Sequence, residues 1–386
     1  MPEPDLVTID RLRHPAPSQM RRLLLKAALG ASAALALPGC ATRVARPIVR
    51  DSRLVLPRLQ VEEALVVREV AGLRPFRPAG FRVEPERIGD KLVIHNYGHG
   101  GCGVTLSWGT AELALEHALA QPERRAAVLG CGAVGLATAR LLQDHGFDVV
   151  IYTRELPPDT VSNIAGAQWG PSSLLDREYR TPEFGARLAR AARFANRRFQ
   201  LLPGEHYGIR WMPLYFVSQK TEFTPGWDWG QTPELFRTRT HAPGTHPFGG
   251  RYLHEIQTMI IEPTIYLPAM MDAFRIAGGR IVVREFRGVE EVAALAEPVV
   301  LNCTGLGARD LFKDDTMLPI KGQLTVLVPQ PEIDYATIAG RFYMFPRRDG
   351  IQLGGTHERG EWSTVPDPAK SAEILEGHRR LFDWKA

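Results

Sequence analysis

Short apolar segments with two different spacings follow one another along the chain and predict a mixed α/β fold. A continuous apolar run at 126–129 predicts a buried strand, and a glycine-rich turn and a helical pattern from 134 to 145 come directly after it. Gly146 is placed to stop that helix, and a second strand is predicted at 148–152. This β-α-β order is typical of a parallel sheet with helices packed on its faces.

The rest of the chain adds further strands and helices to this unit. The segment 54–78 is predicted to be largely extended, because Pro75 and Pro78 disfavour helix at the residues before them. Apolar spacing predicts two more helices, at 105–119 and 264–277. Further strands are expected at 91–95, 281–283 and 299–301, and then repeatedly from 320 to 354, including 341–346 and 351–354 around an Asp349-Gly350 turn.

Composition excludes several classes of protein. Of the 386 residues, 44% are hydrophobic and 23% are charged, which is normal for a globular chain and argues against disorder. The formal net charge of +4 is small, and the basic residues are scattered, so no nucleic-acid partner is expected. Four cysteines do not make a disulfide framework at this length, and none has ligand-type neighbours at metal-binding spacing, so no metal site is expected.

The N-terminal segment resembles an export signal. The pair Arg21-Arg22 precedes an apolar run at 23–37 that is too short to span a bilayer comfortably, and the pair resembles a twin-arginine signal. The sequence Leu37-Pro38-Gly39-Cys40 resembles a lipobox, in which the cysteine is lipidated. The expected location is the bacterial cell envelope, on the periplasmic side, with the membrane contacted through lipidated Cys40. An uncleaved hydrophobic anchor is the alternative.

A glycine-rich loop between the first predicted strand and helix is the candidate cofactor site. Its glycines allow backbone N–H groups to approach a pyrophosphate at the start of a helix, where the helix dipole favours negative charge. Glu155 lies twenty positions beyond Gly135, near the place expected for a ribose-binding carboxylate. The loop alone leaves NAD and FAD open, as well as a tight turn without any ligand. Its candidate cofactor-binding residues are Gly130, Gly132, Ala133, Val134 and Gly135.

Two motifs closely resemble the C-terminal signature of D-amino-acid oxidases. They are Gly72-Leu73-Arg74-Pro75-Phe76-Arg77-Pro78 and His95-Asn96-Tyr97-Gly98-His99-Gly100-Gly101-Cys102-Gly103-Val104-Thr105. In that family the signature comes last, whereas here it precedes the dinucleotide loop. Further resemblance lies at 126–171, 299–305 and 341–363, and each segment occurs once. The chain is therefore predicted to be a circularly permuted member, with the old termini bridged near Pro122.

The resemblance implies FAD as the cofactor and a Rossmann-like FAD-binding domain with an antiparallel-sheet substrate domain. The strand end at 152–157 and the stretch at 162–171 are similar to the family's adenosine and flavin contacts. A helix starting near Thr105 would point its positive end at the flavin ring and stabilise negative charge there. The further cofactor-binding residues implied are Thr153, Arg154, Glu155, Ala165, Gly166, Gln168, Trp169, Thr304, Gly100, Gly101, Gly103, Val104 and Thr105.

The same resemblance assigns the substrate site. Arg74 is the expected partner of the substrate carboxylate, because a guanidinium makes two parallel hydrogen bonds to it. Tyr343 matches the family tyrosine that meets the same group, and the Gly101 carbonyl would accept a bond from the amine. A second family tyrosine is replaced by Ala339. His357 stands where D-aspartate oxidases carry an arginine, so it is either a surface histidine or a partner for acidic side chains.

The implied reaction is FAD-dependent oxidative deamination of D-amino acids, by hydride transfer from the α-carbon and without a side-chain general base. The products are a 2-oxo acid, ammonia and, with oxygen as the acceptor, hydrogen peroxide; another electron acceptor is possible. Two alternatives stay open. One is a glycine or amine oxidase or dehydrogenase on the same fold, and the other is a flavin-binding envelope lipoprotein without catalysis.

The predicted organisation interleaves the two domains along the chain. Residues 1–40 are the export signal with its lipobox, 41–52 a linker, 53–84 a permuted substrate-domain segment, 85–175 the core of the FAD-binding domain, 176–290 mainly substrate domain, 291–315 an FAD-domain segment, and 316–386 substrate domain.

Overall fold

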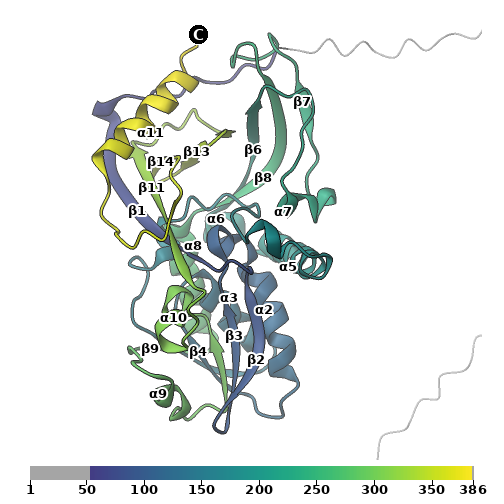
Figure 1. Cartoon of the computed structure of the whole chain (residues 1–386), viewed down its shortest axis with the longest axis vertical. Coiled ribbons are helices and arrows are strands. Elements are labelled where there is room, and N and C mark those ends of the chain that lie inside the picture. The colour runs from purple at the N-terminus through teal and green to yellow at the C-terminus, as the bar shows by residue number, and fades with distance from the viewer. Residues whose placement is uncertain (1–52, 385–386) are drawn as a thin grey trace, which may run out of the picture. The chain divides into compact units, whose positions relative to one another are not determined.

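The computed structural model describes residues 53–384, which form two sheets with helices around them (Figure 1). The expected export signal and linker therefore lie outside the described residues. Within 53–384, no helix combines the length and the apolar character needed to cross a membrane. The α/β fold class predicted from the sequence is confirmed.

The first sheet is mostly parallel and has the order β2-β3-β10-β4-β5-β9. Only its edge strand β2 runs antiparallel to its neighbour. Its strands are β2 (Arg82–Ile88), β3 (Lys91–Tyr97), β4 (Arg125–Leu129), β5 (Asp148–Thr153), β9 (Arg280–Val283) and β10 (Val299–Asn302).

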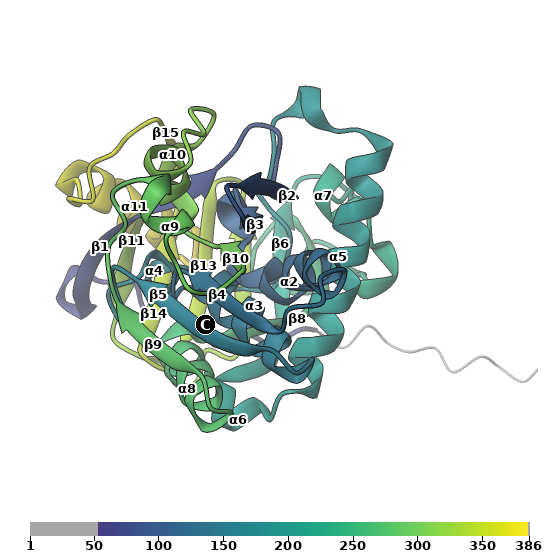
Figure 2. The same cartoon turned by 90° about the horizontal axis from the view of Figure 1, so that it is seen from below.

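Helices cover both faces of this sheet, so successive residues of its strands are buried on opposite sides. On one face Ala126 and Val128 belong to the large core built with α2 (Gly103–Leu119), α3 (Ala133–Asp144) and α8 (Pro263–Ile276). On the other face Ala127 and Leu129 pack beside α9 (Val289–Ala293) and α10 (Ala308–Leu311). Figure 2 shows the sheet between these two groups of helices. Burial on both faces explains why β4 reads as a continuous apolar run.

The second sheet has nine strands in the order β1-β11-β14-β13-β12-β6-β8-β7, with β15 paired to β11. It is antiparallel except for the pair β12 and β6, in agreement with the antiparallel sheet expected for the substrate domain. Its strands are β1 (Val66–Phe76), β6 (Ile209–Ser218), β7 (Arg239–His241), β8 (Tyr252–Ile261), β11 (Leu318–Leu327), β12 (Ala336–Ala339), β13 (Phe342–Arg347), β14 (Gly350–Gly354) and β15 (Glu358–Arg359).

Other helices lie around and between the sheets, and α11 packs on the nine-stranded one. They are α4 (Val161–Ile164), α5 (Pro182–Leu201), α6 (Gly204–Tyr207), α7 (Trp227–Gly230) and α11 (Pro368–Leu381), with short 3-10 turns at η1 (Glu63–Leu65), η2 (Gly100–Cys102), η3 (Arg177–Tyr179), η4 (Pro233–Leu235) and η5 (Gly305–Gly307).

The segment 176–290 differs from its expected placement. Only β6, β7 and β8 belong to the nine-stranded sheet, whereas β9 pairs with β5 in the parallel sheet. The helices α5 and α8 pack against α2 and α3 and bury Leu188 and Phe274 in the same core as the parallel sheet. Sequence spacing could not show this, because an amphipathic helix has the same pattern whichever sheet it covers.

Both ends of the described chain lie in one place on the nine-stranded sheet. The Arg58 guanidinium donates a hydrogen bond of 3.3 Å to the carbonyl of Trp384. Leu54 and Leu56 join a hydrophobic cluster that also contains Phe382 and Trp384. Residues 54–58 and 382–384, near the two ends of the described part of the chain, are thus packed side by side.

Candidate active site

A cavity of about 1160 Å³ lies where the parallel strands end and the nine-stranded sheet begins. The loops after β3, β4, β5 and β10 line one part of it, and residues of β1, β11, β12 and β13 line another. The carboxyl ends of parallel strands are where ligands bind in such sheets. Most of the residues predicted from the sequence as a cofactor or substrate site line this one cavity.

The glycine loop after β4 forms a tight turn against a second loop of the same sheet. Gly130 has a φ of +106°, and a Cβ on it would lie 2.6 Å from the carbonyl oxygen of Cys303. Gly132, Ala133 and Val134 also line the cavity at the start of α3. The predicted glycine loop therefore lines the cavity at a helix N-terminus, and the Ala133 N–H donates to the Ser162 hydroxyl at 3.0 Å.

Gly135 does not line the cavity. A Cβ on it would lie only 2.0 Å from the carbonyl oxygen of Gly130, so this glycine lets α3 pack closely against its own loop. It allows the cofactor loop to pack against α3 and does not itself face the cavity.

The end of β5 supplies Thr153, Arg154 and Glu155 to the cavity wall, as predicted. The Thr153 hydroxyl donates to the Glu155 carbonyl at 2.7 Å, and Arg154 pairs with the Glu155 carboxylate at 3.1 Å. Both side chains of this ion pair are largely exposed, so it contributes little to the stability of the loop. Thr304, after β10, also lines the cavity, and its hydroxyl donates to the Asn302 side chain at 2.7 Å.

Three of the four residues predicted between 165 and 169 line the cavity, namely Ala165, Gly166 and Gln168. Trp169 does not: it is 1% exposed and packs against Phe236 in the core of the parallel-sheet half. Because Gln168 bridges to Ile260 of β8 in an extended conformation, the next side chain points to the opposite side. The expected flavin contact of Trp169 is corrected to a core position.

The turn into α2 brings backbone close to backbone, as the glycine run suggested. Gly100 has a φ of +54°, and a Cβ on it would lie 2.2 Å from the carbonyl oxygen of Ser173. Gly101 is similarly close to Ser172, at 2.9 Å. The other predicted residues of this turn, Gly103, Val104 and Thr105, line the cavity as well.

Cys102 is buried behind this turn, where its thiol contacts the backbone of Ser172. Burial raises the pKa of the Cys102 thiol well above its usual range, so the group stays protonated and inert. The residue fills space and does not face the cavity.

Arg74 and Tyr343 meet in the cavity wall although 269 positions separate them. One guanidinium nitrogen of Arg74 lies 3.4 Å from the Tyr343 hydroxyl. The other, Nη1, is buried and has no hydrogen-bond partner among the described residues. A buried donor without a partner is costly, so a ligand with acceptor oxygens is expected there. Gly101 adjoins this pair, since its Cβ position lies 3.8 Å from Arg74 Cδ.

His357 lines the same cavity but is exposed to solvent. Partial burial and the positive charges of Arg74 and Arg359 lower its pKa. A lowered pKa favours the neutral imidazole near pH 7.

The sequence did not identify the apolar wall beside Tyr343. Phe216, Trp229, Ile338 and Phe345 line the cavity there and belong to one hydrophobic cluster with Tyr343. The Tyr343 and Phe345 rings stack with their centroids 4.9 Å apart. Aromatic residues on strands are usually core residues, and only the pairing of β12, β13 and β6 shows that these face a cavity.

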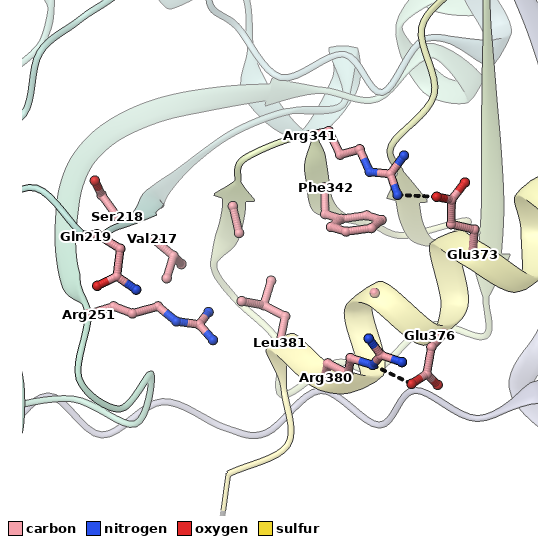
Figure 3. Close-up of a pocket in the computed structure, with 12 residues that line it drawn as sticks. Val217, Ser218, Gln219, Arg251, Arg341, Phe342, Glu373, Glu376, Arg380 and Leu381 are labelled. Atoms are coloured by element: carbon pink, nitrogen blue, oxygen red, sulfur yellow. Dashed lines mark hydrogen bonds and ion pairs between the residues drawn. The ribbon is translucent and has the colours of Figure 1, made fainter.

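A second cavity, of about 590 Å³, lies between α11, the ends of β6 and β12, and the start of β13 (Figure 3). Its carboxylates are already paired, Glu373 with Arg341 and Glu376 with Arg380. It contains none of the predicted site residues, so the larger cavity is the candidate active site.

Comparison with known proteins decides the family. A family model described as DAO, FAD dependent oxidoreductase, matches residues 5–117 and 125–384. The chain belongs to this family. It is 35% identical over 255 residues to a D-amino-acid oxidase of Rubrobacter xylanophilus, covering 65% of this chain and 75% of that protein. It is also 30% identical over 260 residues to a human D-aspartate oxidase, covering 65% and 74%.

A solved glycine oxidase from Geobacillus kaustophilus shares the fold, with a TM-score of 0.51, 16% identity, and coverage of 68% of this chain and 81% of that one. The cavity fits the cofactor of the family. The Gly130 loop lines the cavity at the start of α3, where a pyrophosphate would bind, and Gly100 and Gly101 line it beside Arg74. FAD is therefore the cofactor of this enzyme.

Proposed function

We propose that this FAD-dependent enzyme oxidises D-amino acids to imino acids, which water then hydrolyses to 2-oxo acids and ammonia. The observation that carries the proposal is the buried, unpartnered Nη1 of Arg74 beside the Tyr343 hydroxyl, in the wall of the cofactor cavity. A carboxylate supplies the acceptors that this arrangement lacks. The curated relatives described above are D-amino-acid and D-aspartate oxidases.

FAD, when bound, accepts a hydride from the substrate α-carbon. The chain's own residues bind and orient the reactants. Gly130, Gly132 and the start of α3 would hold the pyrophosphate, and Glu155 would bind the ribose. The N-terminus of α2, which begins at Gly103, lines the cavity, and its partial positive charge would favour the electron-rich form of a bound flavin.

The substrate is oriented by three groups that lie next to one another. Arg74 and Tyr343 bind the carboxylate, and the Gly101 carbonyl accepts a hydrogen bond from the amine. With the carboxylate and the amine fixed, the two enantiomers would exchange the positions of the α-hydrogen and the side chain, so only one of them would present its α-hydrogen for transfer. The apolar wall of Phe216, Trp229 and Ile338 excludes water from the side-chain end of the cavity.

The test is an aerobic assay of the purified, FAD-loaded protein on paired D- and L-amino acids, with glycine and sarcosine included. Oxygen uptake and 2-oxo acid formation are measured, and an artificial electron acceptor is added in parallel. Turnover of D-isomers alone supports the proposal. Preference for glycine or sarcosine would replace it with an amine oxidase, and turnover only with the artificial acceptor would identify a dehydrogenase.

We also propose that the chain is a circular permutant of its family. Two observations support this. The described ends are packed together through Arg58 and Trp384, as is needed if they were once consecutive. The family-model match is interrupted at 118–124, which is the connection between α2 and β4.

Restoring the family's order is expected to preserve the enzyme. A chain that runs from residue 125 to 386 and continues with 51–119 should fold, bind FAD and oxidise the same substrates, because each contact within the two sheets is retained. The measurements are FAD content and Tm, which should lie within about 5 °C of the wild type, since no buried group is lost. A matched permutant cut within β11, between Gln323 and Leu324, should fail. Failure of both would contradict the permutation.

We further propose that residues 1–40 export the enzyme to the cell envelope and that Cys40 is lipidated. The twin-arginine pair, the apolar run and the lipobox-like sequence support this. The membrane would then be a partner through the lipid alone, and the folded part would lie on the periplasmic side.

Cys40→Ser is expected to move the enzyme from the membrane fraction to the soluble periplasmic fraction without changing its activity. Two lipid signals or acyl chains are generally needed for stable anchoring, so loss of the modified cysteine should release the protein. The measurement is fractionation together with mass spectrometry of the N-terminus. Cys303→Ser is the matched control and should remain in the membrane. Equal membrane retention of both variants would contradict lipidation and favour an uncleaved anchor.

A further inference from the structure

Two glycines lie on the cavity face of the nine-stranded sheet, directly beneath the substrate-binding side chains. Gly322 of β11 is opposite Gly72 of β1, and Gly354 of β14 is opposite both Leu324 and Tyr343. Because side chains alternate between the faces of a strand, Gly322, Leu324, Gly354 and Tyr343 share one face. Gly322 and Gly354 are called the glycine floor below.

Arg74 lies flat on the first of these glycines. Arg74 is opposite Ile320, two residues before Gly322 and on the same face, so its side chain extends along the sheet. A Cβ on Gly322 would lie 2.4 Å from Nη1 and 2.5 Å from Nη2 of Arg74. The two guanidinium nitrogens that would bind a carboxylate thus occupy the space that the Cβ of any residue other than glycine at position 322 would fill.

Tyr343 lies flat on the second glycine. A Cβ on Gly354 would lie 2.0 Å from Cζ and 2.3 Å from the hydroxyl oxygen of Tyr343. The ring also stacks with the ring of Phe345, with the centroids 4.9 Å apart. The hydroxyl therefore reaches Arg74 only because position 354 has no side chain.

The backbone at both glycines is held by its neighbours. Gly354 is paired on both sides, with Leu324 and with Tyr343. β11 is paired with β1 along this stretch, and with β15 and β14 on either side of Gly322. The strands therefore cannot easily move away from an added methyl group. The side-chain ends of Arg74 and Tyr343 can move, and these are the groups that bind substrate.

We propose that Gly322 and Gly354 are positioning residues of the substrate-carboxylate site, which act by leaving room for Arg74 and Tyr343. The inference rests on the proposed function for its substrate. An added Cβ tilts the guanidinium or the phenol off the sheet, which changes the direction of the hydrogen bonds to the carboxylate. Folding and FAD binding depend on other contacts and are retained.

The test compares Gly322→Ala and Gly354→Ala with Gly250→Ala, whose added Cβ meets nothing within 4 Å. For both floor variants, KM for D-alanine and Kd for pyruvate should rise roughly 10- to 100-fold, the loss expected when charged hydrogen bonds are misdirected. FAD content and Tm should remain close to the wild type, and Gly250→Ala should match the wild type throughout. Wild-type values of KM and Kd in the floor variants would overturn the inference.

Double variants separate positioning from a general structural effect. Adding Gly322→Ala to an Arg74→Ala enzyme, or Gly354→Ala to a Tyr343→Ala enzyme, should change KM and Kd less than about 3-fold, because the clashing group is gone. An undiminished effect in these backgrounds would overturn the inference. If Gly322→Ala alone does not fold, recovery of folding by Arg74→Ala supports it, and failure to recover overturns it.

Wild-type behaviour is judged separately. If the wild type oxidises no D-amino acid, the proposed function is wrong. The positioning role of Gly322 and Gly354 is tested separately, by comparing the pyruvate Kd of the variants with that of the wild type. The pyruvate Kd gives that comparison a measurement that does not require turnover.

Discussion

Replacement of Arg74 by alanine is expected to lower kcat/KM for D-amino acids by roughly 100- to 10,000-fold. Two charge-assisted hydrogen bonds to the substrate carboxylate are lost, and each bond to a charged group contributes about 1.5–3 kcal/mol in a site of this kind. The effect should appear mainly in KM if the carboxylate is bound equally in the ground and transition states. It is measured by steady-state kinetics on the FAD-loaded enzyme, with FAD content and Tm as checks.

The control for the loss of a positive charge is Arg87→Ala, since the Arg87 side chain is exposed and donates a hydrogen bond to Gln121 outside the cavity. It should retain wild-type kinetics. Whether Arg74 acts through the substrate carboxylate is tested with the amide of the same D-amino acid, which lacks the carboxylate. Its rate should be low with the wild type and should change little in the Arg74 variant. An equal loss for the acid and the amide would show that Arg74 does not bind the carboxylate.

Gly130→Ala is expected to yield a protein with weakened FAD binding. The φ of +106° is unfavourable for alanine, and the added Cβ would lie 2.6 Å from the Cys303 carbonyl oxygen. Strain of this kind costs about 1–3 kcal/mol, and because it falls on the cofactor loop it should lower FAD affinity roughly 10- to 100-fold. The measurement is titration of the apoprotein with FAD.

Gly89→Ala is the matched control for this change. Gly89 also has a positive φ, of +61°, but an added Cβ there meets nothing within 4 Å. It should lower Tm slightly and leave FAD affinity unchanged. If Gly130→Ala binds FAD as tightly as Gly89→Ala does, the loop after β4 is not the pyrophosphate site.

Local elements of the fold were predictable because their signals are local. The run at 126–129, the helix after the glycine loop and the strands near 281 and 299 are confirmed within one or two residues as β4, α3, β9 and β10. Their apolar patterns and turn glycines depend on neighbours a few positions away. The same is true of the cofactor loop, where Gly130, Gly132, Ala133 and Val134 line the cavity and Gly135 of the predicted set does not.

Features that depend on distant pairings were not predictable. Trp169 was assigned to the flavin, but the bridge between Gln168 and β8 turns it into the core. Gly322 and Gly354 carry no motif that marks them, because their role follows from the strands β1 and β13 beside them. Likewise, α5 and α8 have ordinary amphipathic patterns, and only packing shows which sheet they cover.

The most direct test of the central claim is an anaerobic titration of the purified enzyme, followed at the flavin absorbance band near 450 nm, a property of the cofactor. The account predicts a flavin spectrum that bleaches on addition of a D-amino acid and stays unchanged with the L-enantiomer. The Arg74→Ala enzyme should need a far higher concentration for the same bleaching. A yellow protein that no D-amino acid bleaches would contradict the assignment of this cavity as a D-amino-acid site, and a protein that cannot be loaded with FAD would contradict the cofactor assignment.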